Sequence, residues 1–278
     1  EQPGVALSTL PADVPFGVKQ VYSPSLGIGG AYGSWGESYD NDTLLGFIAD
    51  RLGEPLSSSE SLALDNLGFV HRHHIGDLSE AEHLEVELEV GTRMLQAAMQ
   101  AIQWQPEEVD AVMIGMSSPV VDDYVEQIAR RAGVSENAIK VSVHKACDSS
   151  VGALNLALNP RLQASRTYNL AEELYGKKAL VGGIEGLSRF ISRSRDKNAL
   201  QLFGNGAGVI GVTPGESMKF LAGKDHENFD EEGVLAVSMR YPHSRRKVAG
   251  ESLVEVSQEN SRHIRVAGLM HEPESGAP

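Results

Sequence analysis

The segment from Val141 to Leu154 constrains the fold more than any other part of the chain. It begins as a β-branched alternation, passes a short polar corner that holds Cys147, the only cysteine, and ends in small and apolar residues at helical spacing. This pattern predicts a strand, a tight turn and a helix that begins at Cys147. Partial positive charge at a helix N-terminus favours a thiolate. A reactive thiolate and a buried structural thiol both remain open on the residues alone.

The flanking residues predict further alternation of strands and helices. The expected elements are a helix over 80–103, a strand over 109–116, a helix over 123–132, the cysteine unit, a helix over 166–175 and a strand over 178–182. This β-α-β-α-β order puts Cys147 at the carboxyl end of a strand. Open α/β sheets hold their chemistry at such strand ends.

The first 33 residues are less regular. Residues 1–17 contain three prolines and no period, and we expect an irregular leader there. The run from Leu26 to Gly33 is rich in glycine but does not match the dinucleotide-binding fingerprint, so it favours close backbone packing at a strand. Asp42 is a candidate cap for a helix over about 42–52.

Composition excludes several classes of protein. The formal net charge of −14 over 278 residues argues against a general nucleic-acid binder, which needs a basic face. A single cysteine excludes an internal disulfide and fits a reducing compartment. No apolar run approaches a membrane span, and no signal peptide is evident, so we expect a soluble, cytoplasmic protein.

Two histidines raise the question of a metal site. His71 and His73 would share one face of a strand in the segment 67–75. No matching cysteine or carboxylate cluster lies beside them in the sequence. A solvated or substrate-facing basic patch is therefore favoured, and no metal site is expected.

Four blocks, in order, resemble the β-ketoacyl-acyl-carrier-protein synthase III group of the thiolase superfamily. They are 67–75, like the family's Thr-Gly-Ile-x-x-Arg block; 107–119, like its strand before a Thr-Pro-Asp turn; 145–154, with Lys145-Ala146-Cys147; and 181–212, with Phe203-Gly204-Asn205-Gly206-Ala207-Gly208. The resemblance implies an α/β, thiolase-like α-β-α-β-α layered fold whose second half is incomplete in this chain. It divides the chain into a leader (1–17), an N-terminal thiolase-like half with the nucleophile elbow (18–215), and a linker with the start of the C-terminal half (216–278).

The resemblance also implies an activity. Cys147 maps onto the family's acyl-accepting cysteine, which takes an acyl group from a thioester. The acyl-enzyme then reacts with a malonyl-type extender in a decarboxylative Claisen condensation, as in fatty acid or polyketide biosynthesis. Leu187 and Phe203 match positions that line the acyl channel, although ordinary core packing explains them equally well. The substrates are acyl-coenzyme A or acyl-carrier protein, and no cofactor is expected.

This chain departs from the family pattern beyond the cysteine. The family's catalytic His and Asn are not found: His226, His243, His263 and His271 lie far enough downstream, but none has the family's context. The resemblance therefore implies that about the last quarter of a synthase is missing after Pro278. A shortened chain, a partner chain that supplies the rest, and a subunit that lost the function remain open. The family works as a homodimer, so a homodimer or a complex that completes the fold is expected.

Recognition of the donor is a second departure. Leu62 and Asn66 stand where members primed by coenzyme A carry Trp and Arg, which makes acyl-carrier protein a rival donor. We expect an acidic carrier protein to dock on local basic patches, unless these are scattered solvated charges. The candidate patches are Arg189, Arg193, Arg195 and Lys197, and Arg245, Arg246 and Lys247.

Three functions remain. The first is the condensing enzyme. The second is an acyltransferase that passes the Cys147 acyl group to an alcohol or amine on the same fold. The third is a non-catalytic partner subunit of a heteromeric synthase, against which the cysteine at the elbow argues, because a subunit without chemistry has no need for it.

Overall fold

The computed structural model describes residues 6–59, 68–117, 119–144, 146–161, 169–191, 194, 197–222, 254–260 and 263–268. The strands are β1 (Ala6–Leu10), β2 (Val14–Ser23), β3 (Ile28–Trp35), β4 (Glu37–Tyr39), β5 (Arg72–His74), β6 (Ala111–Gly115), β7 (Ile139–His144), β8 (Ala179–Gly186), β9 (Asn205–Val212), β10 (Val254–Asn260) and β11 (His263–Gly268). The α-helices are α1 (Asn41–Leu52), α3 (Glu80–Ile102), α4 (Tyr124–Arg131), α5 (Ser149–Leu158), α6 (Leu170–Glu173), α7 (Ser188–Ile191) and α8 (Lys197–Leu202). Single 3-10 turns lie at η1 (Pro11–Asp13), η2 (Pro106–Glu108) and η3 (Ala146–Asp148).

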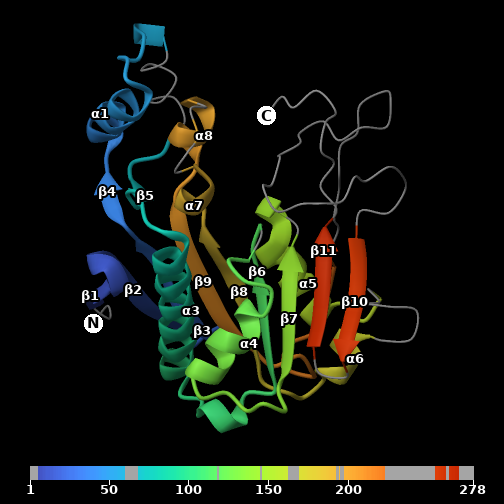
Figure 1. Ribbon diagram of the computed structural model, residues 1–278. Helices are drawn as coiled ribbons and strands as arrows, with labels where there is room; N and C mark the ends of the chain where they lie inside the picture. Colours follow the sequence, from blue (N-terminus) through green and yellow to red (C-terminus); the bar gives the residue numbers. More distant parts are fainter. Residues whose placement is uncertain are drawn as a thin grey trace, which may run out of the picture.

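One mixed sheet organises these elements (Figure 1). Its nine described strands follow the order β1-β2-β3-β9-β8-β6-β7-β11-β10, and β4 and β5 form a separate pair. Strand β6 runs parallel to both β7 and β8, with Gly115 opposite Val143 on one side and Gly183 on the other. The carboxyl ends of these three strands therefore meet at one rim of the sheet. The predicted alternation of strands and helices around the cysteine segment is confirmed.

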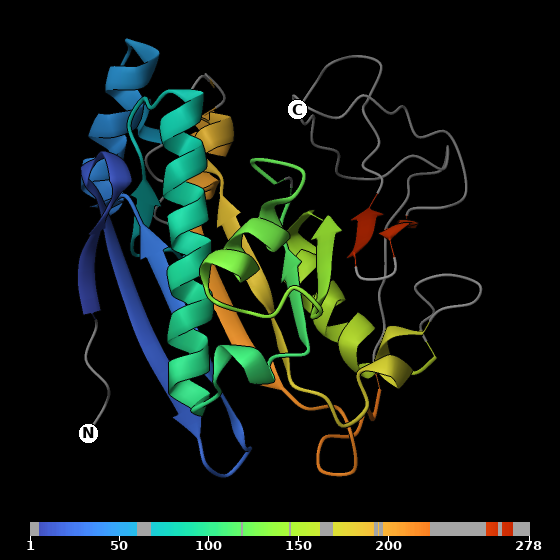
Figure 2. The ribbon, with the colours of Figure 1, turned by 60° about the horizontal axis from the view of Figure 1, so that its bottom comes forward.

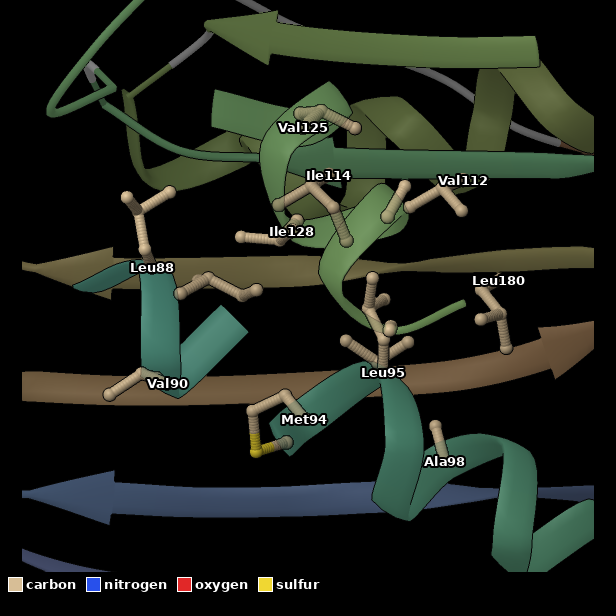
Figure 3. Packing of buried hydrophobic residues seen from close by; sticks show 14 of the residues in the cluster. Leu88, Val90, Met94, Leu95, Ala98, Val112, Ile114, Val125, Ile128 and Leu180 are labelled. Atoms are coloured by element: carbon tan, nitrogen blue, oxygen red, sulfur yellow. The ribbon is translucent and has the colours of Figure 1, made fainter. Parts of the chain in front are cut away.

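Helices cover both faces of the sheet. Helix α3 runs along one face with α4 beside it, and α5 lies on the opposite face (Figure 2). Figure 3 shows part of this packing: Ile128 of α4 lies beside Ile114 of β6, and Met94 and Leu95 of α3 belong to the same buried cluster. A second cluster joins α5 and α6 to the other sides of β6, β7 and β8. The α/β class is confirmed, and the described residues form one α-β-α half of the expected layers.

Local signals set the bounds of α3. Its apolar residues recur at helical spacing, and a capping box closes its first turn: the Ser79 side chain accepts from the Glu82 N–H, and Glu82 accepts from the Ser79 N–H. The helix ends at Gln103, which has left-handed backbone angles. The expected helix over 80–103 is confirmed almost to the residue. No helix in the described ranges combines the length and the apolar character that crossing a membrane requires.

Two expectations about the elements are wrong, and a third is described only in part. Residues 6–17 are not an irregular leader but form β1, η1 and the start of β2, because Pro11 opens the turn between two strands whose Leu10 and Phe16 are buried. The cap of α1 is Asp40 rather than Asp42, with Thr43 N–H donating to Asp40 Oδ1 at 2.8 Å. Helix α6 has only four described residues, and the expected start of that helix lies outside the described ranges.

The glycine-rich run Leu26–Gly33 packs as predicted. It forms most of β3, between β2 and β9. A Cβ atom on Gly30 would collide with the Val209 carbonyl oxygen, and one on Gly33 would collide with the Gly17 carbonyl oxygen. Glycine is required there for close approach of backbones.

Candidate active site

Cys147 lies at the rim where the parallel strands end. Strand β7 ends at His144, the turn η3 carries Cys147, and α5 begins at Ser149. The thiol side chain is exposed. The predicted strand–turn–helix unit is confirmed, and the alternative of a buried structural thiol is wrong.

Backbone contacts fix this elbow to the neighbouring strand β6. The Met116 N–H donates to the Val143 carbonyl at 2.9 Å, and Ser149 Oγ donates to the Met116 carbonyl at 3.1 Å. Gly115 of β6 lies against the first turn of α5: a Cβ at this position would collide with the backbone of Ser149 and Ser150. The first turn of α5, and Cys147 just before it, therefore sit against the end of β6.

Asp148 precedes α5 but does not cap it with its side chain. It occupies the N-cap position, but its side chain accepts no hydrogen bond from the first turn of the helix. A capping residue normally has extended backbone angles, whereas Asp148 has φ −92° and ψ −2° because the turn η3 runs straight into α5. The sequence pattern identified the corner but not this geometry.

Glu185 is a buried carboxyl at the same rim. It is the penultimate residue of β8, and its Oε2 accepts a hydrogen bond from the Ser117 N–H just beyond β6. Oε1 is buried and has no hydrogen-bond partner among the described residues. Burial raises the pKa of Glu185 to about 7, with a further push from the negative charge of Glu87 and opposing pulls from the Ser117 hydrogen bond and from Arg189.

Glu87 and Arg189 form an ion pair on the other side of the same corner. Arg189 Nε lies 3.0 Å from Glu87 Oε1, and the side chains are 12% and 6% exposed. Burial raises the pKa of Glu87 against the lowering effect of Arg189. Gly186 makes room for this pair, since a Cβ there would strike the Glu87 carboxylate. Glu87 was not predicted as a site residue, although a glutamate on the apolar side of a helix is a signal for a buried ion pair.

The two expected acyl-channel residues lie in different surroundings. Leu187 is half-buried and follows Glu185 by two residues, and its carbonyl accepts hydrogen bonds from the first turn of α7. Phe203 is also half-buried and packs on a cluster formed by α1, α7 and α8. The cluster consists of Leu44, Ile48, Leu52, Ile191 and Leu200. Leu187 thus lies close in sequence to the rim residues, while Phe203 takes part in core packing.

The first basic patch is smaller than expected. Arg189 is committed to buried Glu87, so it does not offer its charge to a carrier protein, and this part of the expectation is wrong. Lys197 lies 3.7 Å from Glu54 and is 31% exposed. The other patch residues, Arg193, Arg195, Arg245, Arg246 and Lys247, lie outside the described residues, as do Leu62 and Asn66.

The histidines of the segment 67–75 have separate surroundings. His71 is exposed, and a His73 ring nitrogen lies 3.3 Å from the Gly36 carbonyl. Within the described ranges, no three His, Cys, Asp or Glu side chains come together as a metal site would require. His74, which the sequence analysis did not single out, is buried and stacks on Phe47. Burial and two nearby arginines, Arg51 and Arg72, lower its pKa to about 4.

No protein-family model matches the chain. Solved structures similar to it include the tetronic acid condensing enzyme AbyA1, 25% identical over 63% of this chain and 50% of that one, with a TM-score of 0.42. Another is 3-oxoacyl-(acyl carrier protein) synthase III, FabH, from Pseudomonas aeruginosa PAO1, at 18% identity, 72% and 50% coverage and a TM-score of 0.47. A third is 1,3,6,8-tetrahydroxynaphthalene synthase from Streptomyces coelicolor A3(2), a type III polyketide synthase, at 14% identity, 85% and 65% coverage and a TM-score of 0.48.

The first neighbour is a condensing enzyme, the second is an acyl-carrier-protein synthase III, the group that the sequence blocks resemble, and the third is a type III polyketide synthase. The chain spans about half the length of the first two.

Proposed function

We propose that this chain carries the acyl-accepting part of a condensing enzyme, with Cys147 as the nucleophile. One observation carries the proposal: Cys147 is exposed at the carboxyl end of a parallel strand, immediately before α5. The Cys147 sulfur attacks the carbonyl carbon of an acyl thioester. A carbon–sulfur bond forms to Cys147 while the bond to the donor breaks, and the donor thiol leaves with the proton that the cysteine gave up.

The proposed second half-reaction is a decarboxylative Claisen condensation. A malonyl-type extender loses CO₂, its α-carbon forms a bond to the acyl carbonyl, and the Cys147 sulfur leaves. This step requires no bound cofactor. The His and Asn that the family uses for decarboxylation are not assigned to any residue of this chain, so we propose that a completing chain supplies them. A homodimer is the alternative assembly, and it would add no His or Asn that one chain lacks. The donor is coenzyme A or acyl-carrier protein.

Intact-mass measurement tests the first half-reaction. The protein is incubated with butanoyl-coenzyme A or with butanoyl-carrier protein. We expect one acyl group per chain on the wild type and none on Cys147→Ala, because the sulfur is the only proposed acceptor. Cys147→Ala must keep the wild-type unfolding midpoint for the comparison to count. Equal mass gain in both proteins, or no gain from either thioester, would contradict the proposal.

A further inference from the structure

The two carboxyl oxygens of Glu185 differ, because only one of them has a hydrogen-bond partner. The Ser117 N–H binds Oε2, and Oε1 is buried with no partner in the described part of the chain. A buried polar atom without a hydrogen bond costs about 1–3 kcal/mol, so such atoms are rare in folded proteins. A ligand that supplies the missing partner explains this arrangement.

The side of the sheet on which Glu185 lies points to the elbow. Side chains alternate along a strand, so Val181, Gly183 and Glu185 share one face. Val181 packs with α5 residues, and the space beside Gly183 is filled by Ser150 of α5. Glu185 is the next position on this face, further toward the carboxyl end. Cys147 lies three residues before Ser150, at the same end.

The charges around Glu185 decide which partner fits. The described groups whose charges act on it are Glu87 from α3 and Arg189 from α7, and Tyr124 of α4 responds to the Glu185 charge in turn. Arg189 is already paired with Glu87. Burial is the main reason why the pKa of Glu185 rises to about 7, and the negative charge of Glu87 adds to it, so the protonated form of this carboxyl is favoured below that pH.

A buried carboxyl that holds a proton can both donate and accept a hydrogen bond. A hydroxyl group has the same two capacities, so it satisfies such a carboxyl completely, whereas a plain alkyl chain leaves it without a partner. Sites built around a hydrogen bond to a substrate hydroxyl reject the analogue that lacks it, for this reason.

We propose that Glu185 contacts the acyl group carried by Cys147 and selects acyl chains that bear a hydroxyl group close to the thioester. This inference rests on the proposed function and names its substrate class. Glu185 is a specificity-determining residue in this scheme, and it takes no part in bond making or breaking.

The test compares two acyl groups that differ by one oxygen. Loading of Cys147 by butanoyl- and 3-hydroxybutanoyl-coenzyme A, and by the same two groups on acyl-carrier protein, is followed by intact mass. We expect the wild type to load the hydroxylated group about tenfold faster, the worth of one buried hydrogen bond. Glu185→Leu removes the preference, and Glu185→Gln, which still donates and accepts, keeps most of it. Each preference is a ratio within one preparation, so partial misfolding of a variant cancels.

Glu107→Leu is the matched control. Glu107 is exposed in η2, just before the amino end of β6, so its variant should show the wild-type preference. A wild type without preference, or a Glu185→Leu variant with the wild-type preference, overturns the inference while the proposed function stands. Failure of both acyl groups to load the wild type from either donor overturns the proposed function, and the inference with it.

Discussion

Two buried ionisable side chains, His74 and Glu185, have pKa values displaced in opposite directions. Burial lowers the pKa of His74 beside two arginines to about 4, and burial raises the pKa of Glu185 beside Glu87 to about 7. Both displacements follow from the cost of a charge in a low-dielectric surrounding. Neither residue stood out in the sequence, because the pattern of a strand shows that a side chain is buried but not which charges other elements bring to it.

These displacements predict opposite effects of acid on stability. The pKa of His74 falls from 6.5 to about 4, so only the unfolded chain binds its proton in that window, and stability is lost as the pH falls from 6.5. The full effect is about 3 kcal/mol. The pKa of Glu185 rises from 4.5 to about 7, so the folded chain binds its proton first, and stability is lost as the pH rises through 7.

Urea unfolding at pH 7.5, 6 and 5 separates the two contributions. Relative to the wild type, His74→Leu should lose less stability on acidification, and Glu185→Gln should lose more. Each variant serves as the control for the other, since both remove a buried titratable group but shift the pH dependence in opposite directions. Slopes identical to that of the wild type in both variants would contradict the assignment.

Among the helices and strands, those whose signals lie within one segment of the sequence were predicted correctly. Helix α3 was predicted because its apolar spacing and acidic first turn lie within one segment. Strand β1 was missed because most of its described residues are exposed and only its pairing with β2 makes it a strand, and three prolines in 1–17 suggested irregular chain. The strand, turn and helix around Cys147 were predicted. The close contact between the start of α5 and the end of β6 was not, because it depends on Gly115 of another strand. The spacing of apolar residues within a strand or a helix does not show which other element it will contact.

Gly115→Ala tests the contact between the first turn of α5 and the end of β6. The added methyl group would meet the backbone of Ser149 and Ser150, so α5 must shift from the end of β6. We expect a loss of about 1–3 kcal/mol in the free energy of unfolding, from overpacking, and slower acylation of Cys147. Denaturant unfolding and intact mass measure the two effects.

Gly46→Ala is the matched control for this substitution. Gly46 lies inside α1, and its added methyl group would meet no atom within 4 Å. Alanine has a higher helix propensity than glycine, so the free energy of unfolding of this variant should rise by about 1 kcal/mol. Its Cys147 should be acylated at the wild-type rate. Equal acylation rates in the Gly115→Ala and wild-type proteins would show that the elbow does not depend on this contact.

Two properties belong to the whole molecule: the order of the strands in the sheet and the net charge. The sequence predicted the α/β class and the alternation of strands and helices, while the strand order, with β11 beside β7 and β3 beside β9, required the structure. Long-range pairing of this kind depends on segments more than 100 residues apart, as with β3 and β9. The formal net charge of −14 is spread over a single chain, and self-repulsion of this size opposes a compact state.

Salt should therefore stabilise the protein at neutral pH. Raising NaCl from 20 to 200 mM shortens the Debye length to below about 10 Å and screens the repulsion, so the thermal unfolding midpoint should rise at pH 7.5. The same series at pH 5.1, the isoelectric point expected from the sequence, is the control and should show a much smaller rise. A rise of equal size at both pH values would mean that the net charge is not responsible.

The direction of the strands divides the sheet into two rims of unlike character. Strands β3, β6, β7 and β8 all end at the rim of Cys147, and β9 begins there, with Asn205 donating to the Trp35 carbonyl at 3.1 Å. At the opposite rim, the turns after β2, α3 and α4 join neighbouring elements around the far ends of the same strands. Extra residues at that far rim would lengthen surface connections and leave the thiol where it is, so we expect inserted tags or loops to be tolerated there and not beside Cys147.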